Sequence, residues 1–194
     1  MKKHFLFLLI MLFASNAQSQ AQRDEKLLKK YAKAIDKFNN ANDSSKAEFY
    51  YKRGGIRQDY LDLQGAITDY NKTLKLEPEN AKAYYNRGLA KMDLELLKEA
   101  ILDFTKAIEI DPMNDFAYNN RGICKYMQEN YPAAIEDYTM AIQVNPKFAE
   151  AYNNRASSRF EMGLINEGCE DLHRAYDLGL KNSMNGIKKY CERI

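Results

Sequence analysis

One short stretch occurs three times in the sequence: AYYNRGLAKMDLE at residues 83–95, AYNNRGICKYMQE at residues 117–129 and AYNNRASSRFEMG at residues 151–163. The copies are spaced by 34 residues, and each carries Asn-Arg in the same place. A fixed period of this length is typical of repeat architectures, in which each repeat is one supersecondary unit. The fold therefore follows from what one unit of this length can build.

The period divides the chain into four consecutive units, residues 47–80, 81–114, 115–148 and 149–182. Three places of the unit each keep one type of side chain: aromatic at the fourth, small at the eighth and large at the twenty-fourth. They are Tyr50, Tyr84, Tyr118 and Tyr152 at the fourth place; Gly54, Gly88, Gly122 and Ala156 at the eighth; and Tyr70, Phe104, Tyr138 and Leu172 at the twenty-fourth. A small residue facing a large one lets two helices pack closely.

Each unit also shows two apolar stripes of helical period, separated by a short polar break. Pro78, Pro112 and Pro146 close the first three units, where the missing N–H stops the second helix. In the third unit, Asn130 is placed to cap the second helix. The pattern predicts an all-α protein of stacked helix-turn-helix units, because one helix pair alone cannot bury both of its faces.

These shared places resemble the tetratricopeptide repeat over all four units. The resemblance implies a right-handed superhelix, an α-solenoid, whose first helices line a concave face that binds peptides or protein segments. The family also includes a clamp of Lys, Arg and Asn that holds the terminal carboxylate of chaperone tails. This chain departs from the clamp, because Lys52 is the only basic residue at the fifth and sixth places.

The regions on either side of the repeats are predicted to cover the ends of the array. In residues 183–194 apolar and charged residues are interleaved so that a helix would have one apolar and one charged face, which predicts a C-terminal capping helix. Residues 22–46 are expected to form an N-terminal helix, over 24–38, followed by a polar linker. Terminal repeats usually differ from internal ones in this way.

Residues 1–21 have the pattern of a secretory signal peptide: Lys2 and Lys3, a short apolar run and two small-x-small cleavage patterns. The alternative is an uncleaved anchor. We expect a periplasmic or secreted protein with no membrane span after cleavage. Removal of the leader leaves 27 of the 29 basic residues against 27 acidic ones, a balance that argues against nucleic-acid binding.

Carried over place by place, the family's concave groove falls on residues of the first helices. The predicted peptide-binding groove contains Tyr51, Lys52, Tyr85, Asn86, Asn119, Asn120, Tyr126, Asn153 and Asn154. A carboxamide offers a donor and an acceptor side by side, so Asn86, Asn120 and Asn154 are predicted to face solvent and pair with the backbone of an extended peptide. The alternatives are a solvated polar row or an Asn that bonds within its own unit.

Arginine occupies the seventh place of every unit, and aspartate follows sixteen residues later. The pairs are Arg53 and Asp69, Arg87 and Asp103, Arg121 and Asp137, and Arg155 and Asp171. The hairpin turns between them, so each Arg is predicted to form a structural ion pair with an Asp of its own or an adjacent unit. A basic stripe for an acidic ligand is the alternative. A buried Arg without a partner would be costly.

The remaining chemistry of the sequence gives no reason to expect catalysis. His173 is the only histidine outside the leader, so neither a zinc site nor a catalytic triad can be assembled, and no cofactor or metal is expected. Cys169 and Cys191 are 22 residues apart across the last hairpin. The sequence leaves two alternatives for this pair, a disulfide or two buried thiols. Cys124 is predicted to be a buried apolar residue.

Two functions remain from the sequence. The first is a non-catalytic scaffold that binds an extended protein or peptide segment in the concave groove, in the periplasm or outside the cell. The second is a structural or assembly subunit that self-associates through its ends or its convex face. An exposed apolar first or last helix would favour the second.

Overall fold

The structure is a computed structural model, which describes residues 29–30, 32–33 and 46–192. The predicted signal peptide and most of the predicted N-terminal helix and linker lie outside the described residues. Within the described part every regular element is a helix, which confirms the all-α prediction. None of these helices combines the length and apolar character that crossing a membrane requires.

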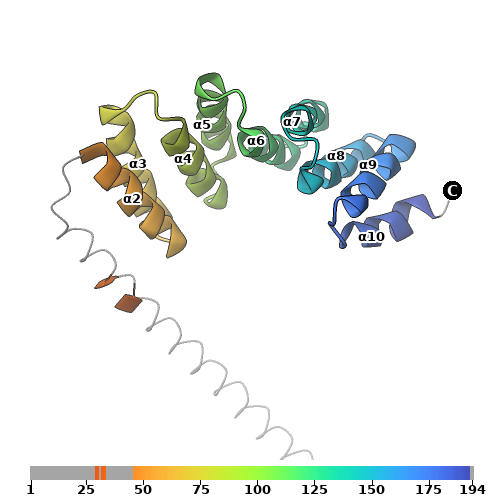
Figure 1. Cartoon of the computed structure of the whole chain (residues 1–194), viewed down its shortest axis with the longest axis horizontal. Helices are drawn as coiled ribbons and strands as arrows, with labels where there is room; N and C mark the ends of the chain where they lie inside the picture. The colour runs from red at the N-terminus through yellow and green to blue at the C-terminus, as the bar shows by residue number, and fades with distance from the viewer. Residues whose placement is uncertain (1–28, 31, 34–45, 193–194) are drawn as a thin grey trace, which may run out of the picture.

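Each repeat contains one pair of antiparallel helices. The pairs are α2 (Lys46–Asp59) with α3 (Leu63–Leu76), α4 (Ala81–Asp93) with α5 (Leu97–Ile110), α6 (Asp115–Met127) with α7 (Tyr131–Val144), and α8 (Ala149–Glu161) with α9 (Ile165–Asp177). The pairs follow one another in an arch, with the first helices on its inner side (Figure 1). We call this inner side the concave face.

The eighth place of the repeat sets how closely the two helices of a pair approach. A Cβ added to Gly122 would lie 2.7 Å from Cε1 of Tyr138, a ring that is itself fully buried. The same pairs are Gly54 with Tyr70 and Gly88 with Phe104, at 2.8 Å in each case. Where the fourth repeat has Ala156, the facing residue is the smaller Leu172. The small residue and the ring therefore form one packing unit.

Side-chain caps and tight turns fix the ends of the helices. Asn80, Asn114 and Asn130 each precede a helix, and the side-chain oxygen of each accepts a hydrogen bond from a backbone N–H of the first turn. The turn inside every hairpin has a left-handed residue at the fifteenth place. These residues are Leu61, Glu95, Glu129 and Gly163, with φ of 64°, 59°, 60° and 74°. Only the fourth repeat uses glycine, the residue that adopts this conformation without strain.

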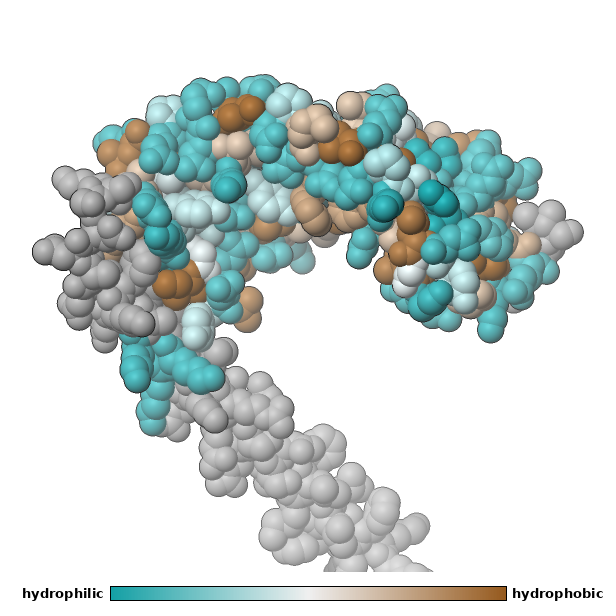
Figure 2. Space-filling view, viewed as in Figure 1, coloured by the Kyte–Doolittle hydropathy of each residue, from teal (hydrophilic) through white to brown (hydrophobic). Residues whose placement is uncertain are grey.

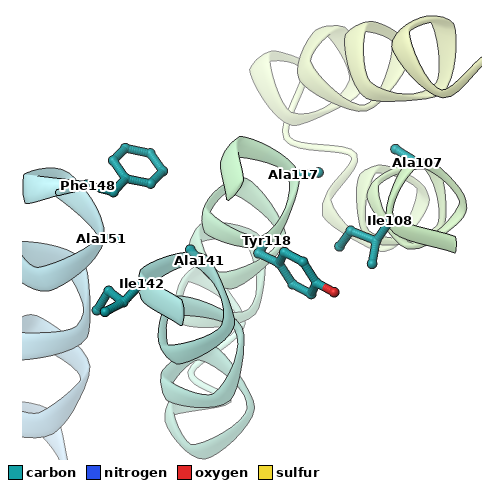
Figure 3. Packing of buried hydrophobic residues seen from close by; sticks show 8 residues of the cluster. All are labelled: Ala107, Ile108, Ala117, Tyr118, Ala141, Ile142, Phe148 and Ala151. Carbon is teal, nitrogen blue, oxygen red and sulfur yellow. The ribbon is translucent and has the colours of Figure 1, made fainter. Parts of the chain in front are cut away.

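The core consists of clusters that join neighbouring repeats, and Figure 3 shows the largest group of these buried residues. Side chains from α5, α6, α7 and α8 meet there. The eight buried residues are Ala107, Ile108, Ala117, Tyr118, Ala141, Ile142, Phe148 and Ala151. Because the second helix of one repeat packs on the first helix of the next, removing an internal repeat would expose apolar surface on both of its neighbours.

The C-terminal cap differs from the single helix predicted over residues 183–194. A short α10 (Ser183–Gly186) continues into a π-helical turn, η1 (Ile187–Cys191), closed by the bond from Glu192 N–H to the Ile187 carbonyl. The wider turn places Ile187 against the last core cluster while Cys191 reaches Cys169 of α9, to which it is joined by a disulfide. Residues 193 and 194 lie outside the described part of the chain.

The contact between Gly122 and Tyr138 predicts that the effect of Gly122→Ala on the free energy of unfolding changes sign with the residue at position 138. In the wild-type background, Gly122→Ala should lower the free energy of unfolding by about 1–2 kcal/mol, because the added methyl group collides with the ring. In a Tyr138→Leu background, the same change should be neutral or stabilising by up to about 1 kcal/mol, because alanine is the better helix former.

Urea denaturation of the four proteins measures this cycle. The pair Ala156 and Leu172 of the fourth repeat is the natural precedent for the double variant. An equal effect of Gly122→Ala in both backgrounds would show that the close approach does not control the helix pair.

Candidate functional site

One aspartate in each helix pair is buried and held by two cations. In the third repeat, Nε and Nη2 of Arg121 donate to Oδ2 and Oδ1 of Asp137 at 3.0 and 2.7 Å, and Lys125 Nζ lies 2.8 Å from Oδ2. The side chain of Asp137 is 3% exposed, so both of its oxygens depend on these partners. We call this arrangement the aspartate triad.

The triad recurs in every repeat. Its members are Arg53, Arg57 and Asp69; Arg87, Lys91 and Asp103; Arg121, Lys125 and Asp137; and Arg155, Arg159 and Asp171. The structure thus places each seventh-place Arg against the Asp of its own repeat. The second cation was not predicted, although a basic residue stands at the eleventh place of all four repeats.

The seventh-place Arg also contacts the preceding repeat. Nη1 of Arg121 donates to Thr105 Oγ1 at 3.1 Å, and its guanidinium lies 5.7 Å above the ring of Tyr118. Two other repeats have the same bond, from Arg87 to Asn71 at 2.6 Å and from Arg155 to Thr139 at 3.0 Å. A planar group with five donors can bind both partners at once, which a lysine cannot. The Arg is therefore a structural link between repeats, and its side chain is mostly buried.

The asparagines of the concave face form a second connection between repeats. The side-chain amide of Asn120 donates to the hydroxyl of Tyr85 in the preceding repeat at 3.0 Å. Equivalent bonds join Asn86 to Tyr51 and Asn154 to Asn119, each at 3.0 Å, and Ser183 of the cap to Asn153 at 3.3 Å. We call these four bonds the concave seam.

The seam gives Asn86, Asn120 and Asn154 a structural role that the prediction of a solvent-facing, peptide-reading row did not include. Each amide is half-buried and is already bonded to the fifth-place residue of the repeat before it, so it does structural work. Asn119 is buried, with 6% exposure, and cannot line a groove. Lys52 forms an ion pair with Glu48 on its own helix.

At the C-terminal end of the concave face, a cavity of about 150 Å³ forms between the last two repeats and the cap. It is lined by Tyr126 of α6; Asn153, Ser157, Phe160 and Glu161 of α8; Leu172 of α9; Gly186 of α10; and Tyr190 of η1. We call it the C-terminal pocket. A smaller cavity of about 100 Å³ adjoins it, sharing Tyr126 and Ser157 and adding Asn154. Of the predicted groove residues, Tyr126, Asn153 and Asn154 are thus brought together here.

Aromatic rings and one carboxylate determine the character of the C-terminal pocket. The rings of Phe160 and Tyr190 are stacked, with centroids 4.4 Å apart. Burial, followed by the nearby charge of Glu161, raises the pKa of the Tyr126 hydroxyl above its ordinary value of 10. Among the residues that line the pocket, Glu161 is the one with a charged side chain.

A larger cavity, of about 590 Å³, lies away from the concave face among the turns that join the repeats. Its lining includes Glu77, Pro78 and Asp111. The side chain of Asn80 is used there as a helix cap and also donates to Glu77. Its polar side chains therefore serve helix termini, and we assign it no ligand.

Further features of the described residues concern their metal-ligating side chains and reactive groups. No group of three or more His, Cys, Asp or Glu side chains in this part of the chain could hold a metal ion. Cys124 is a buried free thiol, and burial raises its pKa to about 11, so it is not an activated nucleophile. His173 is exposed on α9.

Family comparison gives a direct match for the repeats. The model described as "Tetratricopeptide repeat" matches residues 81–114 and 116–148, and the model described as "TPR repeat" matches residues 62–95. No curated protein matches the sequence.

Solved structures with similar folds include the crystal structure of MamA protein, at 27% identity and a TM-score of 0.66, covering 69% of this chain and 73% of that chain. The Arabidopsis OM64 TPR domain is 28% identical, with a TM-score of 0.58, over 59% of this chain and 95% of that chain. The first TPR of Spaghetti (RPAP3), solved bound to the HSP90 peptide SRMEEVD, is 24% identical, with a TM-score of 0.57, over 58% and 91%. The last likeness shows the fold alone. The common architecture is a right-handed superhelix of helix pairs.

The aspartate triad predicts that removing the aspartate alone lowers stability more than removing all three charged side chains. Asp137→Leu should lower the free energy of unfolding by about 3–5 kcal/mol, because two mostly buried cations lose their partner. The triple variant Arg121→Leu/Lys125→Leu/Asp137→Leu should be more stable than Asp137→Leu alone. Glu136→Leu, an exposed acid on the same helix, should change stability by no more than about 0.5 kcal/mol. Urea denaturation would contradict the triad if Asp137→Leu behaved like Glu136→Leu.

The concave seam predicts that a single hydroxyl group couples two repeats. Tyr85→Phe and Asn120→Ala should each lower the free energy of unfolding by about 1 kcal/mol, and the double variant should cost no more than the larger single change. Tyr131→Phe is the control, since its hydroxyl has no hydrogen bond to a described residue. Full additivity of the two changes, measured by denaturation, would rule out the bond.

Proposed function

We propose that this chain, which belongs to the tetratricopeptide repeat family, holds an extended segment of another protein against the C-terminal half of its concave face. Folds of this family serve as protein–protein interaction scaffolds and are generally non-enzymatic. The observation that carries the proposal is the C-terminal pocket, an aromatic-walled cavity on the inner side of the arch.

The shape and chemistry of the concave face support an extended ligand. The arch is hollowed on its inner side (Figure 2). Along this side the ninth and twelfth places of the first helices form a half-buried strip that runs through three repeats. It consists of Leu89, Met92, Ile123, Tyr126, Ser157 and Phe160. Half-buried apolar side chains bordered by polar groups give peptide side chains area to cover. The seam runs beside this strip and keeps it rigid.

We also propose that the protein acts in the periplasm or outside the cell, after removal of residues 1–21. Two features support this location. The leader has the composition of a secretory signal. The disulfide between Cys169 and Cys191 is of a kind that persists in oxidising compartments.

Self-association through the ends is the alternative function, and the C-terminal end does not favour it. In the cap, Ser183 and Ile187 are buried, whereas the exposed positions are Asn185, Lys188, Lys189 and Glu192. A polar outer face on a terminal repeat keeps the end of the array soluble and leaves no apolar surface there for a second copy to cover. The predicted N-terminal helix lies largely outside the described residues.

A bulky substitution at Ser157, within the strip, tests the proposal. The exported protein is first weighed by mass spectrometry, which checks the loss of residues 1–21. Peptides that bind it are then selected from a random twelve-residue display library. These peptides should bind Ser157→Lys at least about 10-fold more weakly than wild type. Lysine at this place would fill both cavities and collide with a bound segment. Loss of about 10-fold corresponds to about 1.4 kcal/mol.

Gln143→Lys is the matched control, because it adds the same side chain at an exposed place on α7. Circular dichroism should show unchanged helical content for both variants. If the library yields no binder, or if the binders hold Ser157→Lys as tightly as Gln143→Lys, the concave face is not the binding site.

A further inference from the structure

The C-terminal pocket has an apolar floor and a mouth rich in hydrogen-bond acceptors. Phe160 and Leu172 belong to the last core cluster and form the floor. A Cβ added to Gly186 would lie 2.7 Å from Cδ1 of Leu172, so the backbone of the cap closes directly on the floor at this place, and Tyr190 supplies the side chain of the cap that lines the pocket. The resulting cavity is small, about 150 Å³, and offers apolar surface to an aliphatic chain.

Glu161 provides the only charge among the residues that line the pocket. Its side chain is exposed at the rim, and no described basic group forms an ion pair with it. The hydroxyl proton of Ser157 is donated inward to the carbonyl of Asn153 at 3.1 Å, so the Ser157 oxygen is left as an acceptor. The mouth thus offers an unpaired carboxylate and neutral acceptors.

Lys189 of the cap places its ammonium group on the Tyr190 ring beside the pocket. Nζ of Lys189 lies 4.4 Å from the centroid of the Tyr190 ring and donates to the Tyr190 hydroxyl at 2.6 Å. Ammonium groups are drawn to the faces of aromatic rings by the ring quadrupole. Lys189 is exposed and is not part of the pocket lining, so the acceptors inside the mouth remain for a ligand.

We propose that the C-terminal pocket seats a lysine side chain of the bound segment, with its methylene stem on Phe160 and Leu172 and its ammonium group at Glu161. Lysine combines an apolar stem with a charged tip, which matches an apolar floor under an acidic rim. This inference rests on the proposed function and adds a specificity to it: the partner presents a basic residue, the opposite of the terminal carboxylate that the family's chaperone-tail clamp holds.

The test uses N-acetyl-lysine methylamide and its neutral analogue N-acetyl-norleucine methylamide, titrated into the full exported chain and followed by amide NMR. The lysine compound should shift the resonances of Ser157, Glu161 and Gly186, and the norleucine compound should bind at least several-fold more weakly. Glu161→Gln should weaken the binding of the lysine compound by about 2–5-fold, as expected for a rim ion pair.

Asp93→Asn is the matched control, since Asp93 is an exposed acid at the same place of the second repeat and does not line the pocket. It should leave the affinity unchanged. Equal binding of the two compounds, an equal loss in Asp93→Asn and Glu161→Gln, or no shift of these resonances would overturn the inference. In each of those cases, library peptides that bind wild type but not Ser157→Lys would still support the proposed function.

Discussion

A buried aspartate between two cations is the interaction on which the rest of this structure depends. The carboxylate of Asp137 sits inside the helix pair, where its charge is tolerable only because Arg121 and Lys125 meet both of its oxygens. The same Arg extends to Thr105, so the arrangement that orients two helices within a repeat also sets the position of the repeat before it. Apolar packing supplies most of the stabilisation, but it is less directional than a forked guanidinium held on both sides.

The connections between repeats determine where a ligand can bind. On the concave face, the fifth and sixth places form hydrogen bonds from one repeat to the next, and the last bond, from Ser183 to Asn153, carries the seam into the cap. Side chains committed to these bonds are poor candidates for recognition, since a ligand would have to compete with the fold. Among the described residues, side chains of α6, α8, α9 and the cap surround the C-terminal pocket. The disulfide between Cys169 and Cys191 fixes the part of the cap that completes this pocket.

The period of the sequence was sufficient to predict the helix pairs, because the same small and aromatic residues recur in each unit and have one packing solution. It also identified Arg121 and Asp137 as partners. Lys125 was missed, although the recurrence of a basic residue at its place carried the same signal. The hydrogen bond of Asn120 was not predicted, because its partner, Tyr85, lies 35 residues earlier in the neighbouring repeat. An amide that faces the groove and an amide that bonds across the seam recur in the sequence with the same period. The C-terminal pocket could not be predicted, since it depends on a π-helical cap that breaks the repeat.

The claim that the seventh-place Arg links neighbouring repeats is tested most directly by native-state amide hydrogen exchange on Arg121→Lys. Lysine keeps the charge beside Asp137 but cannot also donate to Thr105. The account predicts that protection falls in α5 of the preceding repeat as well as in α6 and α7, because both interfaces share the guanidinium. Loss of protection confined to α6 and α7, with α5 unchanged, would contradict it.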